Sequence, residues 1–167
     1  MSILLPILLG LLALCAELFV REALALDSWA PEFLVVLLLF LGTHRGGRAV
    51  GIAALLGALA DGFKGSPLGL HMLHAVLLTY GAAALANQVR FRGILGNLLL
   101  GALGGVLSLF LLALLSRVFL SGTPLGVRIG ALIVPQVTLN ALLVPLAFPV
   151  LEKLEGLLIG RKDSDVL

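Results

Sequence analysis

The sequence predicts an all-α integral membrane protein, folded as a compact bundle of about six transmembrane helices. Hydrophobic residues make up 60% of the 167-residue chain and only 12% are charged, whereas soluble domains carry about a quarter charged residues. The apolar residues also form long blocks separated by short polar turns. Because so little charge cannot cover a water-facing surface, most helix faces are expected to contact lipid. We assign residues 1–160 to a single polytopic membrane domain, followed by a polar tail over 161–167.

The first helix is expected over residues 3–24 and is interpreted as a retained membrane helix. No basic residue precedes its apolar run, and Leu14 stands where a signal peptide needs a small residue. Glu17 and Arg21 are four residues apart, so they share a helix face and can pair. Cys15, the only cysteine, excludes an internal disulfide.

The second and third helices, over 31–42 and 48–61, are both short. A membrane crossing takes roughly 20 residues, so each needs its flanks to reach across. Pro31 suits the first turn of the second helix. A re-entrant hairpin over 33–60 is the alternative, although the basic turn between the two segments favours full crossings.

Three further helices are expected over 66–88, 94–118 and 129–151. Ser66 resembles an N-cap, with Pro67 at the first helical position. The last helix holds prolines that permit bends. Two glycine pairs, Gly47–Gly51 and Gly101–Gly105, are expected to let another helix, including a partner's, approach closely.

The distribution of basic residues predicts that both termini are cytoplasmic. One side of the predicted bundle holds Arg45, Arg48, Arg90, Arg92, Lys153, Arg161 and Lys162. The other side holds Arg21, Lys64, Arg117 and Arg128. The turn after the third helix then lies on the outer side of the membrane. The net charge of +2 is too small to indicate nucleic-acid binding.

The polar turn, residues 61–74, interrupts two apolar blocks and carries the most unusual side chains of the chain. Asp61 ends a face of small residues and could cap the following helix, or serve as a ligand or proton site; the cap is favoured. His71 and His74 could join Asp61 in a metal site, but no third nitrogen or sulfur ligand has a recognisable spacing. Hydrogen bonding to the turn or to a helix end is the favoured role of the histidines.

Polar side chains in the last helix raise a second question about function. Gln136 and Asn140 are four apart, just after Pro135, and can form hydrogen bonds to another helix; a substrate pocket is the alternative. The stretch 65–69 superficially resembles a nucleophile elbow but lacks the strand–turn–helix context. No catalytic, cofactor or metal residue is therefore expected, and the chain is predicted not to be an enzyme.

Two motifs resemble the rod shape-determining protein MreD family: Asp61 with the stretch from Gly65 to His71, and Pro135-Gln136 with Asn140 and Pro145. The family has five or six membrane helices, similar in fold to the S components of energy-coupling-factor vitamin transporters. The resemblance implies a non-enzymatic scaffold of the bacterial inner membrane, which acts in cell elongation and lateral peptidoglycan synthesis. Its implied partner is the bitopic protein MreC, and through it RodA, the elongation transpeptidase and MreB, besides membrane lipid.

The candidate partner or pocket residues follow from these two motifs. They are Asp61, Gly65, Ser66, Pro67, Leu68, Gly69, His71, Pro135, Gln136, Asn140 and Pro145. The alternative function is a vitamin-binding S component with a polar pocket on the outer side. Such a protein usually presents small residues on its first helix to an energising partner, and the few alanines of 3–24 speak against that role.

Overall fold

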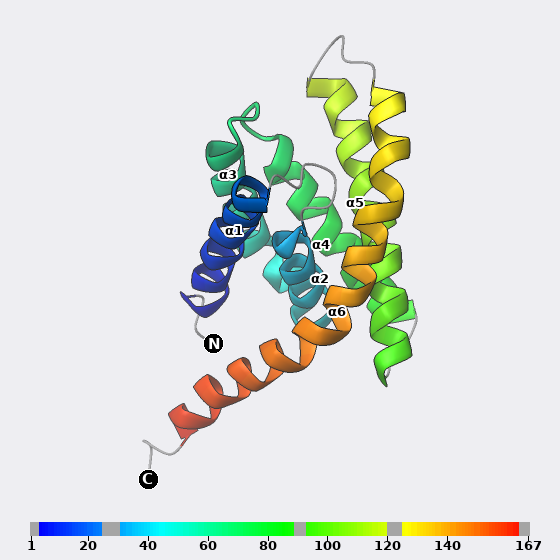
Figure 1. The fold of residues 1–167 in the computed structure, drawn as a ribbon. Helices are drawn as coiled ribbons and strands as arrows, with labels where there is room; N and C mark the ends of the chain where they lie inside the picture. Colours follow the sequence, from blue (N-terminus) through cyan, green and yellow to red (C-terminus); the bar gives the residue numbers. More distant parts are fainter. Residues whose placement is uncertain (1–3, 25–30, 89–92, 120–124, 164–167) are drawn as a thin grey trace.

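The computed structural model describes residues 4–24, 31–88, 93–119 and 125–163, and all regular structure in these ranges is helical. The elements are α1 (Leu4–Leu24), α2 (Phe33–Arg45), the 3-10 turn η1 (Gly46–Ala49), α3 (Val50–Lys64), α4 (Leu70–Gln88), α5 (Gly93–Phe119) and α6 (Leu125–Asp163). The prediction of an all-α fold is therefore confirmed, and Figure 1 shows the arrangement of the helices.

Helix α2 is the centre of the bundle. All of its residues from Leu34 to Gly42 are buried, and α1, α4, α5 and α6 all pack against it. A helix that is apolar on every side has to be enclosed by other helices. In this chain a short and uninterrupted apolar segment forms the core, and the longer helices around it expose apolar faces to the surroundings.

Five helical segments, rather than the predicted six, are long and apolar enough to cross a membrane within the described residues. The two helices predicted over 31–42 and 48–61 account for the difference. In the structure they belong to one helical run, Phe33–Lys64, which is interrupted by η1 and counts as a single span. With 13 and 15 residues, α2 and α3 reach only about 20 and 22 Å at 1.5 Å per residue. Neither covers roughly 30 Å of hydrocarbon alone.

Helix α4 begins at Leu70, four residues after the predicted start at Ser66. The prediction of Ser66 as N-cap and Pro67 as first helical residue was therefore wrong. Gly69 has φ +100°, a conformation outside the right-handed helix that glycine adopts without strain. The helix cannot extend back through this residue, so 65–69 form an extended turn.

Helix α6 is much longer than the predicted 129–151 and continues to Asp163. It contains Pro135, Pro145 and Pro149, and the permitted bend is present: the last third of α6 turns away from α5 (Figure 1). Proline bends a helix because it removes a backbone hydrogen bond and crowds the preceding turn. The bend carries the end of α6 towards the start of α1. The predicted polar tail begins within α6, and its last four residues, 164–167, lie outside the described residues.

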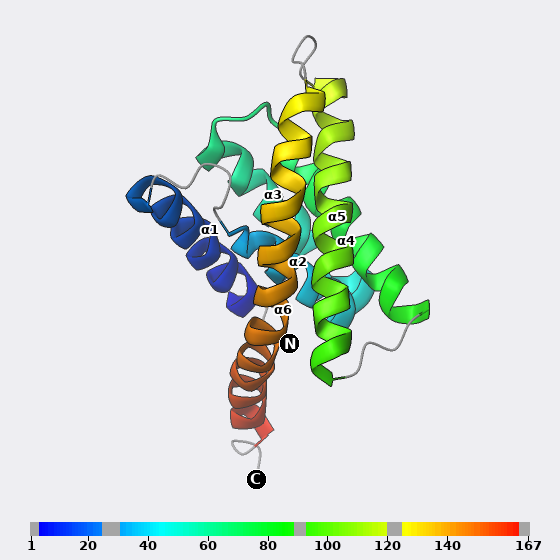
Figure 2. The ribbon, with the colours of Figure 1, turned by 45° about the vertical axis from the view of Figure 1, so that its right-hand side comes forward.

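The close approach predicted at Gly101 and Gly105 is confirmed, and the helix that approaches is α6. A Cβ atom at Gly101 would overlap the Asn140 carbonyl oxygen, and one at Gly105 would lie 3.3 Å from Val137 Cα. Helices in a membrane associate through such packing contacts. As Figure 2 shows, α5 and α6 run side by side as one long hairpin.

The polar turn and the ends of the chain lie at opposite ends of the bundle. The first residue of α1 and the last of α6 are at the lower end in both views, whereas the connection between α3 and α4 is at the upper end (Figures 1 and 2). This placement matches the predicted alternation of helix directions.

Candidate functional site

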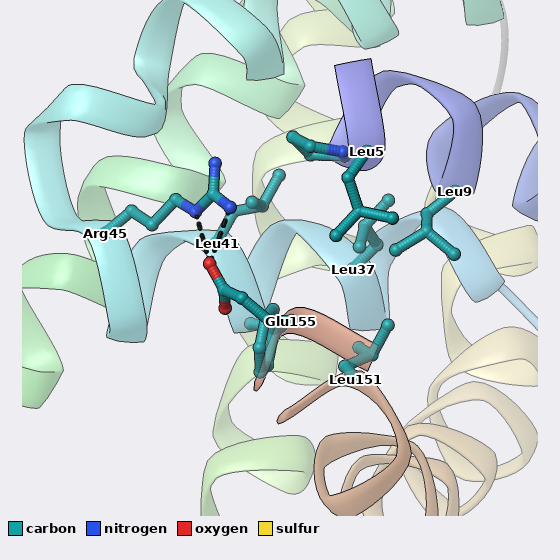
Figure 3. Close-up of a pocket in the computed structure, with 9 residues that line it drawn as sticks. Leu5, Leu9, Leu37, Leu41, Arg45, Leu151 and Glu155 are labelled. Carbon is teal, nitrogen blue, oxygen red and sulfur yellow. Dashed lines mark hydrogen bonds and ion pairs between the residues drawn. The ribbon is translucent and has the colours of Figure 1, made fainter. Parts of the chain in front are cut away.

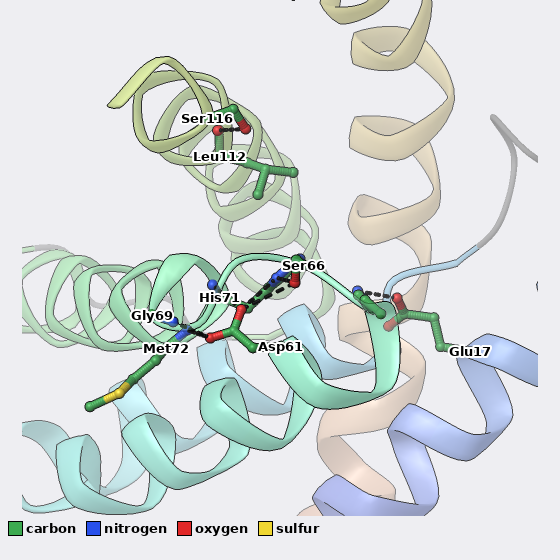
Figure 4. Close-up of polar contacts among 9 residues, drawn as sticks. Glu17, Asp61, Ser66, Gly69, His71, Met72, Leu112 and Ser116 are labelled. Atoms are coloured by element: carbon green, nitrogen blue, oxygen red, sulfur yellow. Dashed lines mark hydrogen bonds and ion pairs between the residues drawn. The ribbon is translucent and has the colours of Figure 1, made fainter. Parts of the chain in front are cut away.

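Asp61 organises the polar turn by accepting hydrogen bonds from the start of α4. Its side chain is 1% exposed. Oδ2 accepts from the backbone N–H of Gly69 (2.8 Å) and Met72 (3.4 Å), and Oδ1 from that of His71 (2.7 Å). These are the orphan donors that every helix start leaves without a partner. The prediction that Asp61 caps this helix is confirmed (Figure 4).

Two further side chains close the turn around the same carboxylate. The Ser66 hydroxyl donates to Asp61 Oδ1 (3.2 Å), and His71 Nδ1 lies 3.0 Å from that oxygen and 2.9 Å from Ser66 Oγ. Figure 4 shows Ser66 and His71 contacting Asp61 on one side and Gly69 on the other. The carboxylate therefore meets five donor groups of its own chain, and the turn is a closed polar unit.

His74 does not join this unit. Its Nε2 lies 3.0 Å from Ser108 Oγ and 3.2 Å from the Ser108 carbonyl oxygen, so it links α4 to α5. His71 therefore bonds to the turn, as the favoured interpretation expected, whereas His74 contacts the middle of α5 and not the turn or a helix end. In the part of the chain that the structure describes, no three His, Cys, Asp or Glu side chains gather closely enough to hold a metal ion.

The second motif links α6 to the start of α2 and to α5. Gln136 Nε2 donates to Glu32 Oε1 at 3.2 Å; the bond was predicted to reach another helix, and it reaches the residue just before α2. Asn140 is buried against the Gly101 and Gly105 face of α5, and its Oδ1 has no hydrogen-bond partner among the described residues. Asn140 therefore contributes to helix packing rather than to a hydrogen-bonded pair.

A layer of charged residues lies beside the polar turn and was not predicted. Glu17 pairs with Lys64 at 2.6 Å. The four-residue spacing had suggested a pair with Arg21 instead. Glu17 Oε2, Arg21 Nε and Gln136 Oε1 are buried and lack hydrogen-bond partners among the described residues. Burial raises the pKa of Glu32, against the opposing effect of the Lys64 ammonium.

The signal for the Glu17–Lys64 pair was present in the sequence. Glu17 lies near the end of the predicted helix 3–24 and Lys64 in the turn after 48–61, and both helix ends were predicted on the same side of the membrane. Opposite charges at one membrane boundary are candidates for pairing. The spacing along α1 favoured Arg21 as the partner of Glu17. Spacing within one helix cannot show which other helix lies next to it.

A second set of polar contacts, one of them an ion pair, holds the opposite end of the bundle. Arg45 donates to Glu155 Oε1 from its guanidinium Nη2 (2.6 Å) and Nε (3.1 Å), and His44 lies 3.2 Å from Glu152. Figure 3 shows the Arg45–Glu155 pair below the start of α1, beside a cleft of about 10 Å³. This contact was missed because the last helix had been ended at residue 151.

A larger apolar groove continues from this cleft. It has a volume of about 460 Å³, within the range of ligand-sized pockets. Its walls are α1 and α6, and its floor is α2. The lining residues are Leu9, Leu12, Ala13, Ala16, Phe33, Val36, Leu37, Leu143, Leu146, Ala147, Val150, Leu151 and Leu154. We call it the α1–α6 groove; every residue that lines it is apolar.

The sequence matches the family model described as rod shape-determining protein MreD over residues 1–156. The chain belongs to the MreD family. Membership gives it a role in rod shape determination, and MreD is a family of structural, shape-determining membrane proteins. No curated protein and no solved structure matches the chain. The likeness in fold to transporter S components therefore remains a prediction.

Proposed function

We propose that this MreD-family chain is a non-enzymatic scaffold of the cell-elongation machinery in the bacterial inner membrane. In this role it binds MreC, and through MreC it influences RodA, the elongation transpeptidase and MreB filaments during lateral peptidoglycan synthesis. The family match over 1–156 carries the proposal. The geometry supports it, because the polar groups of the turn are used within the chain while large apolar side chains remain exposed.

In this proposal the polar residues of the turn stabilise its conformation, and the exposed tip of the turn is the part that a partner can contact. Asp61, Ser66, Gly69 and His71 hold the turn together by the contacts above. Leu68 at its tip is 84% exposed, so it is available to the segment of a partner just outside the membrane. Gly65, with φ +60°, and Pro67 shape the turn that presents this tip.

The glycine pairs differ in what they can offer a partner. Gly101 and Gly105 are covered by α6 of the same chain, so the expectation that they receive a partner's helix is not supported. Gly47 and Gly51 are exposed, and among the described residues no atom lies within 4 Å of a Cβ built at Gly51.

We also propose that both termini are cytoplasmic and that the polar turn faces outward. The basic residues support this orientation. The shared position of the α1 start and the α6 end (Figure 1), with the Arg45–Glu155 pair close to the α1 start (Figure 3), is consistent with it.

Affinity purification of the tagged chain from its native membrane tests the proposal, with mass spectrometry of proteins and small molecules. Recovery of MreC in near-equal amount, without a vitamin, is the expected result. Recovery of a vitamin together with nucleotide-binding subunits would refute the scaffold and establish the transporter alternative.

A further inference from the structure

The last third of α6 is held at the end of α2 by polar side chains. Past its prolines this segment turns away from α5 (Figure 1). Arg45 at the end of α2 donates to Glu155 from two guanidinium nitrogens, and His44 lies 3.2 Å from Glu152. We call residues 150–163 the α6 arm, and the contact between His44 and Glu152 the histidine clasp.

The His44 ring is held in one orientation by its surroundings. It stacks on Phe40 with ring centroids 4.2 Å apart, and Phe148 of α6 meets it edge-on at 5.6 Å. Its Nδ1 lies 3.1 Å from the Phe40 carbonyl oxygen and 3.1 Å from the Thr43 hydroxyl oxygen. Its Nε2 lies 3.2 Å from Glu152 Oε1. Contacts of the ring and of both nitrogens therefore determine which way the imidazole points.

The contacts of Nδ1 place a hydrogen on that nitrogen. A carbonyl oxygen only accepts hydrogen bonds, so the contact with Phe40 needs a donor on the ring. The Thr43 hydroxyl gives its single hydrogen to carbonyl oxygens of α2, so it is a second acceptor for Nδ1. A ring without a hydrogen on Nδ1 would turn a lone pair towards two acceptors. His44 therefore carries this hydrogen in any state that keeps these contacts.

The contact of Nε2 then requires one further proton. A neutral imidazole carries a hydrogen on only one of its nitrogens, and an ionised carboxylate brings only lone pairs. With the hydrogen on Nδ1, the Nε2 lone pair would face the negative oxygen of Glu152. The clasp is complete only with a proton on Nε2 or on Glu152, and on Nε2 it makes the hydrogen bond charge-assisted. Loss of this proton turns an attractive contact into a repulsive one.

The clasp is open to the surrounding solution, and its neighbours differ from it in chemistry. The side chains of His44 and Glu152 are 34% and 57% exposed, so protons can reach them. Within the described residues, the elements around this end of α2 carry these other titratable or charged side chains: Arg45, Arg48, Tyr80, Lys153 and Glu155. Of all these residue types, only histidine ordinarily changes its charge between pH 5 and 8.

We propose that the histidine clasp is a pH-sensitive latch. It holds the α6 arm at α2 while the clasp carries its extra proton, and it loosens the arm when that proton leaves. The pair of Arg45 and Glu155 keeps the arm attached in both states, so the proton changes the fraction of molecules in which the arm is fully docked. The arm brings Val150, Leu151 and Leu154 to the wall of the α1–α6 groove. The pH at this end of the bundle therefore changes the shape of the groove.

Pulsed electron–electron double resonance between two spin labels tests the latch in the full-length chain, purified and returned to lipid nanodiscs. Cys15, the only cysteine, is first replaced by serine. Leu157→Cys on the arm and Leu95→Cys on α5 then carry the labels, at positions that are 72% and 77% exposed. We expect one main distance at about pH 5.5. At about pH 8.5 a second distance should appear, and the docked population should fall roughly twofold or more.

Two variants keep a polar contact at the clasp without the extra proton. The amide of Glu152→Gln can donate to a neutral Nε2, and the amide of His44→Gln can donate to the carboxylate. We expect the docked population of each to differ by less than about 1.5-fold between the two pH values. Lys153→Gln is the matched control, because it removes an exposed charge next to Glu152 and should leave the pH response of the parent unchanged.

A parent chain whose docked population stays the same or rises between the two pH values would overturn the latch. So would a pH response that persists at full size in both His44→Gln and Glu152→Gln, because another group would then carry the proton. If His44→Gln does not accumulate in the membrane, Glu152→Gln decides, since the loss of an exposed carboxylate costs little stability. None of these outcomes depends on MreC, so the latch and the proposed function are tested separately.

Discussion

The polar turn and the α1–α6 groove show opposite ways of using a membrane helix bundle. In the turn, one buried carboxylate accepts hydrogen bonds from Ser66, Gly69, His71 and Met72. The polar side chains of the turn therefore form their hydrogen bonds within the chain. In the groove, ordinary leucines and alanines remain open. Polar residues in the membrane need hydrogen-bond partners and therefore stabilise the fold. Apolar residues need no such partner, so they can remain exposed to lipid or to another protein.

This difference changes which residues are expected to recognise a partner. The motif from Asp61 to His71 carries the resemblance to the family, yet its polar side chains, Asp61, Ser66 and His71, contact one another within the turn (Figure 4). The groove has no unusual residue at all. A motif can therefore mark a family through its fold, because its polar side chains hold the turn together.

The largest expected effect comes from removing the centre of the polar turn. Asp61→Ala leaves the N–H groups of Gly69, His71 and Met72 without their acceptor, and we expect it to lower the free energy of unfolding by about 2–4 kcal/mol. Denaturation of the purified chain in detergent, followed by size-exclusion chromatography, measures the change. Glu152→Ala, which removes an exposed carboxylate at the other end, is the control, with an expected cost under about 1 kcal/mol.

Equal stability of the two variants would mean that Asp61 does not hold the turn. The turn would then be free to serve as a binding site, and the contrast between turn and groove would disappear. Ser66→Ala sharpens this test. It removes one hydroxyl from the same carboxylate and should cost about 1 kcal/mol, clearly less than Asp61→Ala.

A smaller effect on stability is expected from replacing a glycine by alanine, and it should differ between the two glycine pairs. Gly101→Ala introduces a methyl group where Asn140 O and Ala141 Cα already lie, and overpacking costs about 1–3 kcal/mol. Gly51→Ala meets no atom within 4 Å among the described residues and should be neutral or stabilising by up to about 1 kcal/mol. Thermal unfolding of both variants in the same detergent measures the difference. A loss at Gly51 as large as at Gly101 would place a contact there that the fold does not account for.

The smallest expected effect concerns pH and the charged layer. Burial raises the pKa of Glu32, so its proton is held more tightly in the folded than in the unfolded chain. The stability that this proton contributes is present below the unfolded pKa and is lost as the pH rises through the folded pKa. Glu32→Gln keeps an oxygen for Gln136 and cannot ionise. The unfolding temperature of the variant should therefore fall less than that of the parent as pH rises from about 5 to 8. Parallel curves would contradict the assignment.

Much of the fold follows from local signals in the sequence. The parts that could not be predicted share one cause: they depend on which helices become neighbours. Apolar blocks predicted the helices, and the cap at Asp61 follows from a carboxylate close to the predicted helix start at Ser66. The pairing of Glu17 with Lys64, and of Arg45 with Glu155, depends on which helices are neighbours. The groove depends on the bend of α6 past residue 145, and prolines show that a bend is possible but not its direction.

The short central helix shows the same limit in another form. The pattern of Phe33–Gly42 identified an apolar segment, but its burial on every side results from the packing of four other helices around it. Counting it as an independent crossing led to the prediction of six spans. The sequence alone cannot distinguish a short buried helix from a short membrane crossing.

The most direct test of the account is a crosslink from the tip of the polar turn in living cells. Leu68 is at this tip and is 84% exposed, whereas the polar side chains behind it bind one another. With a photo-crosslinking amino acid at position 68, the account predicts an adduct with the segment of MreC just outside the membrane. Recovery of MreC with the chain, but no adduct from position 68, would contradict the account and move recognition away from the turn.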